Sequence, residues 1–138
     1  MKDTFTIWVF AIIFDKNNRI LLCHRTDYDL WDLPGWWLEK SETPWQWVVR
    51  EVKEETWFDV EVVKMSGIYS KPNTSDIVLQ FICKIIWGKI TINDEADEIK
   101  YFAFEDIPKN TIKKHIFRIN DVLKNPNKFY MKEQIGKT

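Results

Sequence analysis

Glycine and cysteine are both scarce in this chain of 138 residues, which contains four glycines and two cysteines. Cys23 and Cys83 stand alone in separate apolar stretches, which excludes a disulfide framework and a cysteine-based zinc pattern. We expect both to be buried free thiols in a cytoplasmic protein. Against the four glycines stand eight tryptophans, an unusual number for a chain of this size.

An excess of charge of one sign is also missing. The net charge is -1, so the sequence implies no strong attraction to a nucleic acid polymer or to a membrane surface. The apolar run from Ile7 to Phe14 is too short to cross a bilayer. We therefore expect one soluble globular domain over residues 1–138, with a loosely packed C-terminal tail from about residue 130.

The apolar pattern predicts strands before and after a helix. Residues 5–14 are apolar on both alternating faces, which is typical of a central strand covered on both sides. After a polar turn, residues 19–24 read as the returning strand of a hairpin. Further strands are predicted at 60–69, 76–86 and 99–104. Apolar residues at helical spacing then predict a helix from Ile112 that ends at Asn125-Pro126, with His115 exposed.

A first helix is predicted to begin between Ser41 and Pro44, where cap candidates, an acid and a proline occur together. Its buried stripe is expected to contain Trp45, Val48, Val49 and Val52. Trp47 is then expected on the opposite face. This order of elements predicts an α/β fold, an α/β/α sandwich around a mixed β-sheet.

Three carboxylates share that opposite face. Glu51, Glu54 and Glu55 stand at positions i, i+3 and i+4, close enough to meet at one site. Like charges so placed repel, and a divalent cation such as Mg²⁺ or Mn²⁺ would compensate them. The alternative is a solvated acidic helix face whose charges pair with Arg50 and Lys53.

The surrounding residues favour the metal site. Leu33-Pro34-Gly35 precedes the helix. Glu42 lies eight residues before Arg50. The pattern continues as Arg50-Glu51-Val52-Lys53-Glu54-Glu55 and ends at Phe58. This long, fixed spacing resembles the signature of the Nudix hydrolases. The resemblance implies the same sandwich fold and Mg²⁺-dependent hydrolysis of a pyrophosphate bond in a nucleoside diphosphate derivative. ADP-ribose, nucleoside triphosphates and dinucleoside polyphosphates all stay open as substrates, and homodimer formation is an open alternative.

The same resemblance assigns roles within the motif. It implies that Glu51, Glu54 and Glu55 bind the metal together with the main-chain carbonyl of Gly35. Glu54 and Arg50 are then catalytic, and Glu42 pairs with Arg50 to orient the ligand glutamates. A direct contact between Arg50 and the substrate phosphate is the alternative.

Other candidates lie outside the motif. Glu98 is our first choice for an additional acid, as ligand or general base, and Glu95 is the second choice. Arg25, at the end of a predicted strand, is either a surface cation or a phosphate contact. The aromatic residues expected to line the substrate cleft are Trp36, Trp37 and Phe81.

Trp36 and Trp57 occupy the two glycine positions of the motif. At the second of these, a left-handed backbone is expected at the end of the helix, which costs a residue other than glycine about 1–2 kcal/mol. At the first, a bulky side chain stands in the loop expected to approach the metal. These tryptophans suggest an alternative function. The protein would be an engineered or diverged Nudix scaffold that is catalytically impaired, and its tryptophan-rich pocket would bind an aromatic or apolar small molecule.

Overall fold

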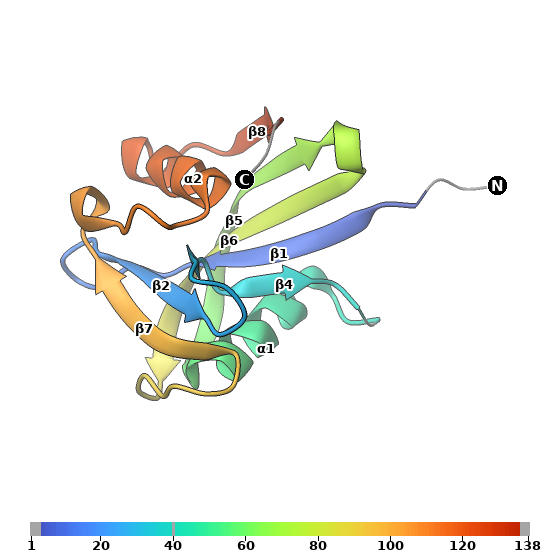
Figure 1. Cartoon of the computed structure of the whole chain (residues 1–138). Helices are drawn as coiled ribbons and strands as arrows, with labels where there is room; N and C mark the ends of the chain where they lie inside the picture. The colour runs from blue at the N-terminus through green and yellow to red at the C-terminus, as the bar shows by residue number, and fades with distance from the viewer. Residues whose placement is uncertain (1–3, 40, 136–138) are drawn as a thin grey trace.

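The computed structural model describes residues 4–39 and 41–135. Within them, two helices and eight strands follow one another along the chain (Figure 1). The elements are β1 (Thr6–Ile12), β2 (Ile20–Arg25), β3 (Trp31–Asp32), β4 (Gly35–Trp37), α1 (Pro44–Thr56), β5 (Asp59–Lys71), β6 (Asp76–Trp87), β7 (Ala96–Phe102), α2 (Lys113–Lys124) and β8 (Tyr130–Glu133). Short 3-10 turns occur at Pro72–Thr74 and Phe104–Asp106. The strands form a mixed five-stranded sheet in the order β4-β1-β6-β5-β8 and an antiparallel three-stranded sheet in the order β3-β2-β7.

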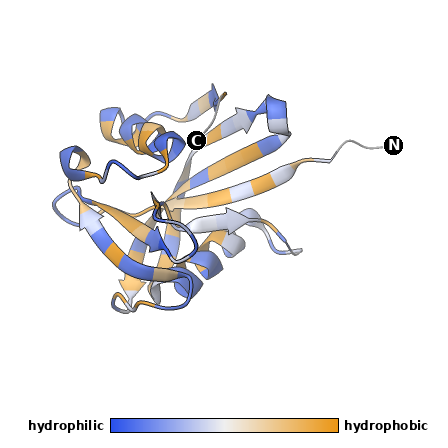
Figure 2. Cartoon of the chain, in the orientation of Figure 1, coloured by the Kyte–Doolittle hydropathy of each residue, from blue (hydrophilic) through white to orange (hydrophobic). Residues whose placement is uncertain are grey.

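Strand β1 lies in the middle of the fold, parallel to β6 and antiparallel to β4. On one of its faces Val9 and Ala11 pack in the core that includes α1, and on the other Phe10 and Ile12 pack in the core that includes α2. Figure 2 shows that apolar residues gather in the strands between the two helices. The predicted central strand and the α/β/α arrangement are therefore confirmed.

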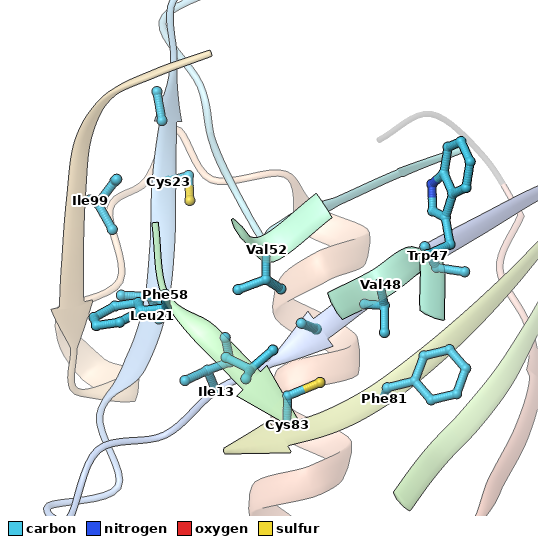
Figure 3. Packing of buried hydrophobic residues seen from close by; sticks show 14 residues of the cluster. Ile13, Leu21, Cys23, Trp47, Val48, Val52, Phe58, Phe81, Cys83 and Ile99 are labelled. Atoms are coloured by element: carbon cyan, nitrogen blue, oxygen red, sulfur yellow. The ribbon is translucent and has the colours of Figure 1, made fainter. Parts of the chain in front are cut away.

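The core beside α1 contains Val48 and Val52, which pack with side chains of β2, β6 and β7 (Figure 3). Trp47 belongs to this core and is only 2% exposed, whereas Trp45 is 55% exposed. The predicted stripe is thus wrong at these two positions. Trp45 lies in the first turn of α1, and the buried face of the helix includes Trp47 and Glu51.

The turn between β1 and β2 forms as predicted, but the two strands do not make a regular hairpin. Asp15 N–H donates to the carbonyl of Arg19, and Phe14 forms a single bridge with Ile20. Beyond this bridge β2 enters the second sheet, between β3 and β7. The reason is that both edges of β1 are already occupied by β4 and β6.

Helix α2 buries polar groups as well as apolar ones. His115 is 5% exposed and Arg118 is fully buried, so the expectation that His115 is exposed is wrong. The Arg118 guanidinium donates to the side-chain oxygens of Gln80 and Gln134, at 3.0 and 2.9 Å. The main-chain N–H of Leu33 donates to His115 Nδ1 at 3.0 Å. These partners come from distant segments, so helical periodicity alone does not reveal the buried polar face.

The C-terminal segment is more ordered than the sequence suggests. Residues Tyr130–Glu133 form β8, which pairs in parallel with β5 through residues 67–70. Tyr130 is 6% exposed. The expected loose tail from about residue 130 is therefore wrong for this strand, while residues 136–138 lie outside the described part of the chain. Cys23 and Cys83 are buried free thiols, as expected. Among the described residues, no helix is both long enough and apolar enough to span a bilayer.

Trp57 ends α1 in the left-handed conformation expected at this position, with φ 67° and ψ 7°. Its main-chain N–H donates to the carbonyl of Lys53 at 2.9 Å, which closes the last turn. The indole is half exposed and the Lys53 ammonium lies 5.2 Å from its ring centre. The helix thus ends in the usual way, at the expense of backbone strain at a large residue.

This strain can be measured by comparing two substitutions. Trp57→Gly and Trp57→Ala remove the same exposed ring, but only glycine adopts a positive φ without steric conflict. We expect Trp57→Gly to have the higher free energy of unfolding, by about 1 kcal/mol, in urea denaturation. Equal stability of the two variants would show that the left-handed backbone at Trp57 carries no strain.

Candidate functional site

An acidic cavity of about 430 Å³ lies beside the C-terminal half of α1 and is completed by β2, β3, β4 and the loop before β7. Its lining includes one arginine, Arg25, and a set of acidic residues. The acids are Asp27, Asp32, Glu39, Glu51, Glu54, Glu55, Asp94 and Glu95. This imbalance of charge suits a cation rather than a free anionic substrate.

The start of α1 is held by a reciprocal cap. Thr43 Oγ1 accepts from the main-chain N–H of Gln46, and Gln46 Oε1 accepts from the N–H of Thr43. Pro44 occupies the first turn, where its missing N–H removes no hydrogen bond. The cap fixes where the helix begins, and the glutamates consequently occupy its last two turns. There the negative end of the helix dipole disfavours carboxylates, which increases the need for a cation.

Three carboxylates come within mutual reach at this end of α1. Oxygen atoms of Glu51, Glu54 and Glu95 all lie within 4.8 Å of one another. Glu95 is brought there by a turn around Asn93, whose side chain donates to the carbonyl of Glu55 and accepts from the N–H of Glu95. An oxygen-only set at these separations can hold a hard divalent cation.

Glu98, the first choice for the additional acid, does not line this cavity. It stands on β7 opposite His24, pairs with Lys100 at 3.1 Å and groups with His24 and Asp97. Glu95, the second choice, joins the helix glutamates instead. The asparagine turn before β7 is the one local signal that distinguishes the two, because it folds the loop back onto the end of α1.

Glu55 is held by a main-chain amide. The N–H of Gly35 donates to Glu55 Oε2 at 2.9 Å. Gly35 pairs with Phe10 across the sheet at φ 150°, and a Cβ at this position would lie 2.0 Å from the carbonyl oxygen of Val9. Only glycine allows this approach. Gly35 thus contacts Glu55 through its main-chain N–H. Metal binding by the Gly35 carbonyl stays a prediction.

Arg50 makes the contact with Glu42 that the motif implies. The separation between Arg50 Nη2 and Glu42 Oε1 is 2.7 Å, and that between Arg50 Nη1 and Glu54 Oε1 is 3.8 Å. The guanidinium also lies 4.3 Å from the ring centre of Trp47. Because Arg50 is not part of the cavity lining, this position favours orientation of Glu54 over direct phosphate binding.

Burial and mutual repulsion make the cavity acids hard to ionise. Burial, followed by the charges of Glu54 and Glu95, raises the pKa of Glu51 to about 7. Burial raises the pKa of Asp32 to about 7 as well, against the opposing charge of Arg25 at 3.6 Å. Burial, with Asp32 and Glu51 nearby, holds the pKa of Glu55 well above its ordinary value. Such a concentration of perturbed acids is typical of a functional site.

Asp32 is a member of this group that sequence reasoning missed. It directly precedes the Leu33-Pro34-Gly35 segment, and that adjacency is the signal that could have identified it. Its position on β3, paired with Cys23, brings it to the cavity. Arg25 reaches the same cavity from β2 and is gripped by Asp27 through two hydrogen bonds of 2.8 and 2.7 Å.

The three aromatic candidates have different surroundings. Trp36 lines the acidic cavity, which stays open beside it, and Trp36 is not one of the residues with a positive φ. Trp37 is 38% exposed, with its ring centre 4.5 Å from that of Trp36. Phe81 is 2% exposed, packs in the core with Val48 and does not line the acidic cavity (Figure 3). Its large apolar ring on a central strand explains that burial.

Comparison with known proteins gives one consistent family. The family model of the NUDIX domain matches residues 4–122. A MutT-like protein from Streptomyces ambofaciens is 30% identical over 118 residues, which cover 86% of this chain and 77% of that protein. An ADP-ribose pyrophosphatase from Methanocaldococcus jannaschii is 36% identical over 104 residues, covering 70% of this chain and 62% of the relative.

Solved structures agree. A NUDIX hydrolase from Nitrosomonas europaea superposes with a TM-score of 0.86 at 22% identity, over 99% of this chain and 82% of that one, a likeness of fold alone. An ADP-ribose pyrophosphatase from Streptococcus suis gives a TM-score of 0.76 at 26% identity, over 95% of this chain and 100% of that one.

The raised pKa of Glu51 predicts a pH-dependent stability. Its pKa is 4.5 in the unfolded chain and about 7 in the fold, so the folded state retains this proton to higher pH. Glu51 therefore destabilises the metal-free fold increasingly as the pH rises through that window. Residue 51 cannot titrate in Glu51→Gln. The free energy of unfolding of this variant, relative to that of the wild type, should therefore be higher at about pH 7 than at pH 4.5.

Urea denaturation in metal-free buffer, at each end of that pH window, measures this difference. Glu61→Gln, which removes an exposed acid on β5, is the matched control. A gain from Glu51→Gln that is the same at both pH values would contradict the shifted pKa.

Proposed function

The chain belongs to the Nudix family of pyrophosphohydrolases, and on that premise we propose that it hydrolyses a nucleoside diphosphate derivative with bound Mg²⁺ or Mn²⁺. The observation that carries the proposal is the approach of Glu51, Glu54 and Glu95 to within 4.8 Å of one another. A pyrophosphate brings further negative charge to a cavity already rich in acids, and a divalent cation between them would reduce the repulsion.

The donor set fits such a cation. Its atoms are carboxylate oxygens, which are the ligands that Mg²⁺ and Mn²⁺ prefer. Glu51, Glu54 and Glu95 would hold the metal, and Glu55, oriented by the Gly35 amide, stands beside them. When bound, the metal would lower the pKa of a coordinated water and neutralise phosphate charge.

The remaining residues position this set and move protons. Arg50, fixed by Glu42, keeps Glu54 aimed at the cavity. Glu95 completes the set and is held beside the helix glutamates by the turn around Asn93. The attacking water passes its proton to a carboxylate of the cavity that is not bound to the metal. Attack on one phosphorus breaks the bridging P–O bond, and the leaving phosphate takes up the electron pair. Arg25, at the rim beside Trp36, can contact the phosphates.

A second candidate rests on the tryptophans. The rings of Trp8, Trp36 and Trp37 lie within 4.5 to 5.7 Å of one another, a cluster that could bind an aromatic or apolar molecule. We favour the enzyme, because the acidic cavity stays open beside Trp36 and its carboxylates are together. The cytoplasmic location and homodimer formation stay predictions.

The two functions are separated by chromatographic measurement of the nucleotide products formed from ADP-ribose, nucleoside triphosphates and dinucleoside polyphosphates, with and without Mg²⁺. We expect Mg²⁺-dependent turnover of at least one of them. Absence of turnover, together with tight binding of an aromatic ligand, would favour the impaired scaffold instead.

The same assay tests the acid assignment with a matched pair of variants. Glu95→Gln removes a carboxylate from the cavity and should lower kcat by about a hundredfold, a typical effect of losing a proton-transfer or ligand group. Glu98→Gln, three residues away and outside the cavity, should leave kcat close to the wild-type value. If Glu98→Gln lowered kcat and Glu95→Gln did not, Glu98 would be the acid that catalysis requires.

A further inference from the structure

A second cavity, of about 360 Å³, adjoins the acidic cavity. Both cavities are lined by Trp36 and Arg25, so they meet at these two side chains. The lining of the second cavity is opposite in character: among the described residues it contains no acid, while Arg25, Lys71 and Lys114 are basic. One extended molecule can therefore occupy both.

The positive charge of this second cavity is concentrated on the side of Lys71. Arg25 is already neutralised by its two hydrogen bonds to Asp27. Lys71, at the end of β5, makes no ion pair within the described part of the chain. Its pKa is lowered first by burial and then by the charges of Lys114 and Arg118, against the opposing charge of Asp76 on the neighbouring strand. Lys71 therefore has a positive charge with which an anionic ligand can pair.

A buried arginine adds to this field from behind the cavity wall. Arg118 is fully buried and its guanidinium lies 5.0 Å from the ring centre of Phe10, a wall residue. Its hydrogen-bond partners, Gln80 and Gln134, are neutral amides, so they do not cancel its charge. A fixed positive charge in a low-dielectric wall acts strongly on a ligand beside it.

The other walls include the aromatic rings of Trp8 and Tyr28. The indole N–H of Trp8 donates to Asp76 Oδ1 at 3.0 Å, and the Trp8 ring meets that of Trp36 edge to face at 5.7 Å. Tyr28 lies across the same cavity, with the Arg25 guanidinium 5.8 Å from its ring centre. Aromatic walls of this kind suit a planar ring such as a nucleobase.

His115 contributes a donor to the same lining. Its Nδ1 accepts from the N–H of Leu33, so the proton of the neutral ring is on Nε2. Burial and the charge of Arg118 lower the pKa of His115 well below its ordinary value, in keeping with a neutral ring. The cavity thus combines planar walls, a neutral donor and an excess of cations.

We propose that this second cavity binds the end of the substrate distant from the metal, and that this end is a nucleoside carrying a phosphate in addition to the scissile pyrophosphate. The inference rests on the proposed function, because the pyrophosphate must occupy the acidic cavity. An uncharged nucleoside would leave half-buried Lys71 with Asp76 alone to offset the charges of Lys114 and Arg118, whereas an added phosphate accepts charge-assisted hydrogen bonds from it.

Matched substrate pairs that differ by one phosphate test the inference. Coenzyme A is compared with 3′-dephospho-coenzyme A, and 2′-phospho-ADP-ribose with ADP-ribose, all with Mg²⁺. We expect kcat/KM to be about tenfold higher for at least one phosphorylated member than for its partner, the effect typical of one hydrogen bond to a charged group. Equal rates, or a preference for the unphosphorylated member in both pairs, would overturn the inference while leaving the proposed function intact.

Two lysine variants locate the effect. Lys71→Gln should bring the rate ratio within the pair close to one, whereas Lys113→Gln should leave the ratio at its wild-type value. Lys113 is exposed and does not line this cavity, although it adjoins Lys114 on α2. If the ratio of kcat/KM values within the pair were unchanged in Lys71→Gln, the added phosphate would bind elsewhere.

Binding separates failure of this inference from failure of the proposed function. Calorimetric titration with adenosine 3′,5′-bisphosphate, adenosine 2′,5′-bisphosphate and AMP requires no turnover. At least one bisphosphate should bind about tenfold more tightly than AMP to the wild type, and this advantage should be lost in Lys71→Gln. If no substrate is hydrolysed but the advantage is seen, the function is wrong and the cavity assignment stands. Equal binding of all three ligands would overturn the cavity assignment.

Discussion

Repulsion among carboxylates at the end of α1 is the constraint on which the site depends. Glu51 is buried beside Glu54, and Glu55 and Asp32 are held nearby with raised pKa values. Withdrawing each such charge from water costs several kcal/mol, to an order of magnitude. The described residues offset part of this cost through the Gly35 amide and Arg25. A divalent cation is the partner that would offset the rest.

The rest of the fold keeps those acids together. The register between β1 and β4 brings Gly35 against Val9, where a side chain of any size would collide with the backbone. Trp47 packs in the core and beneath Arg50, which in turn reaches Glu42 and Glu54. Displacing any of these would move a carboxylate, and errors of about 1 Å in such a site can cost about a hundredfold in rate.

The features that local spacing controls were predictable from the sequence. Carboxylates at i, i+3 and i+4 had to share a helix face, and the contact between Arg50 and Glu42 followed from the family pattern. The strand of residues 5–14 was identified because its two faces are equally apolar.

Features that depend on long-range packing were not predictable. Periodicity alone does not show where a helix leaves the core, so the burial of Trp47 and the exposure of Trp45 were exchanged. The choice between Glu95 and Glu98 depends on a loop folding back onto α1. Burial of His115 depends on an amide from a different segment, that of Leu33.

The central claim is that the carboxylates of α1 and Glu95 bind a divalent cation, and a Mg²⁺ titration of the unfolding temperature at neutral pH tests it most directly. A ligand that binds only the folded state raises this temperature as its concentration exceeds the dissociation constant. We predict a progressive rise for the wild type, and none for the variant in which Glu51, Glu54 and Glu95 are all glutamine. An unfolding temperature that does not respond to Mg²⁺ or Mn²⁺ in the wild type, or that responds equally in the triple variant, would contradict the account.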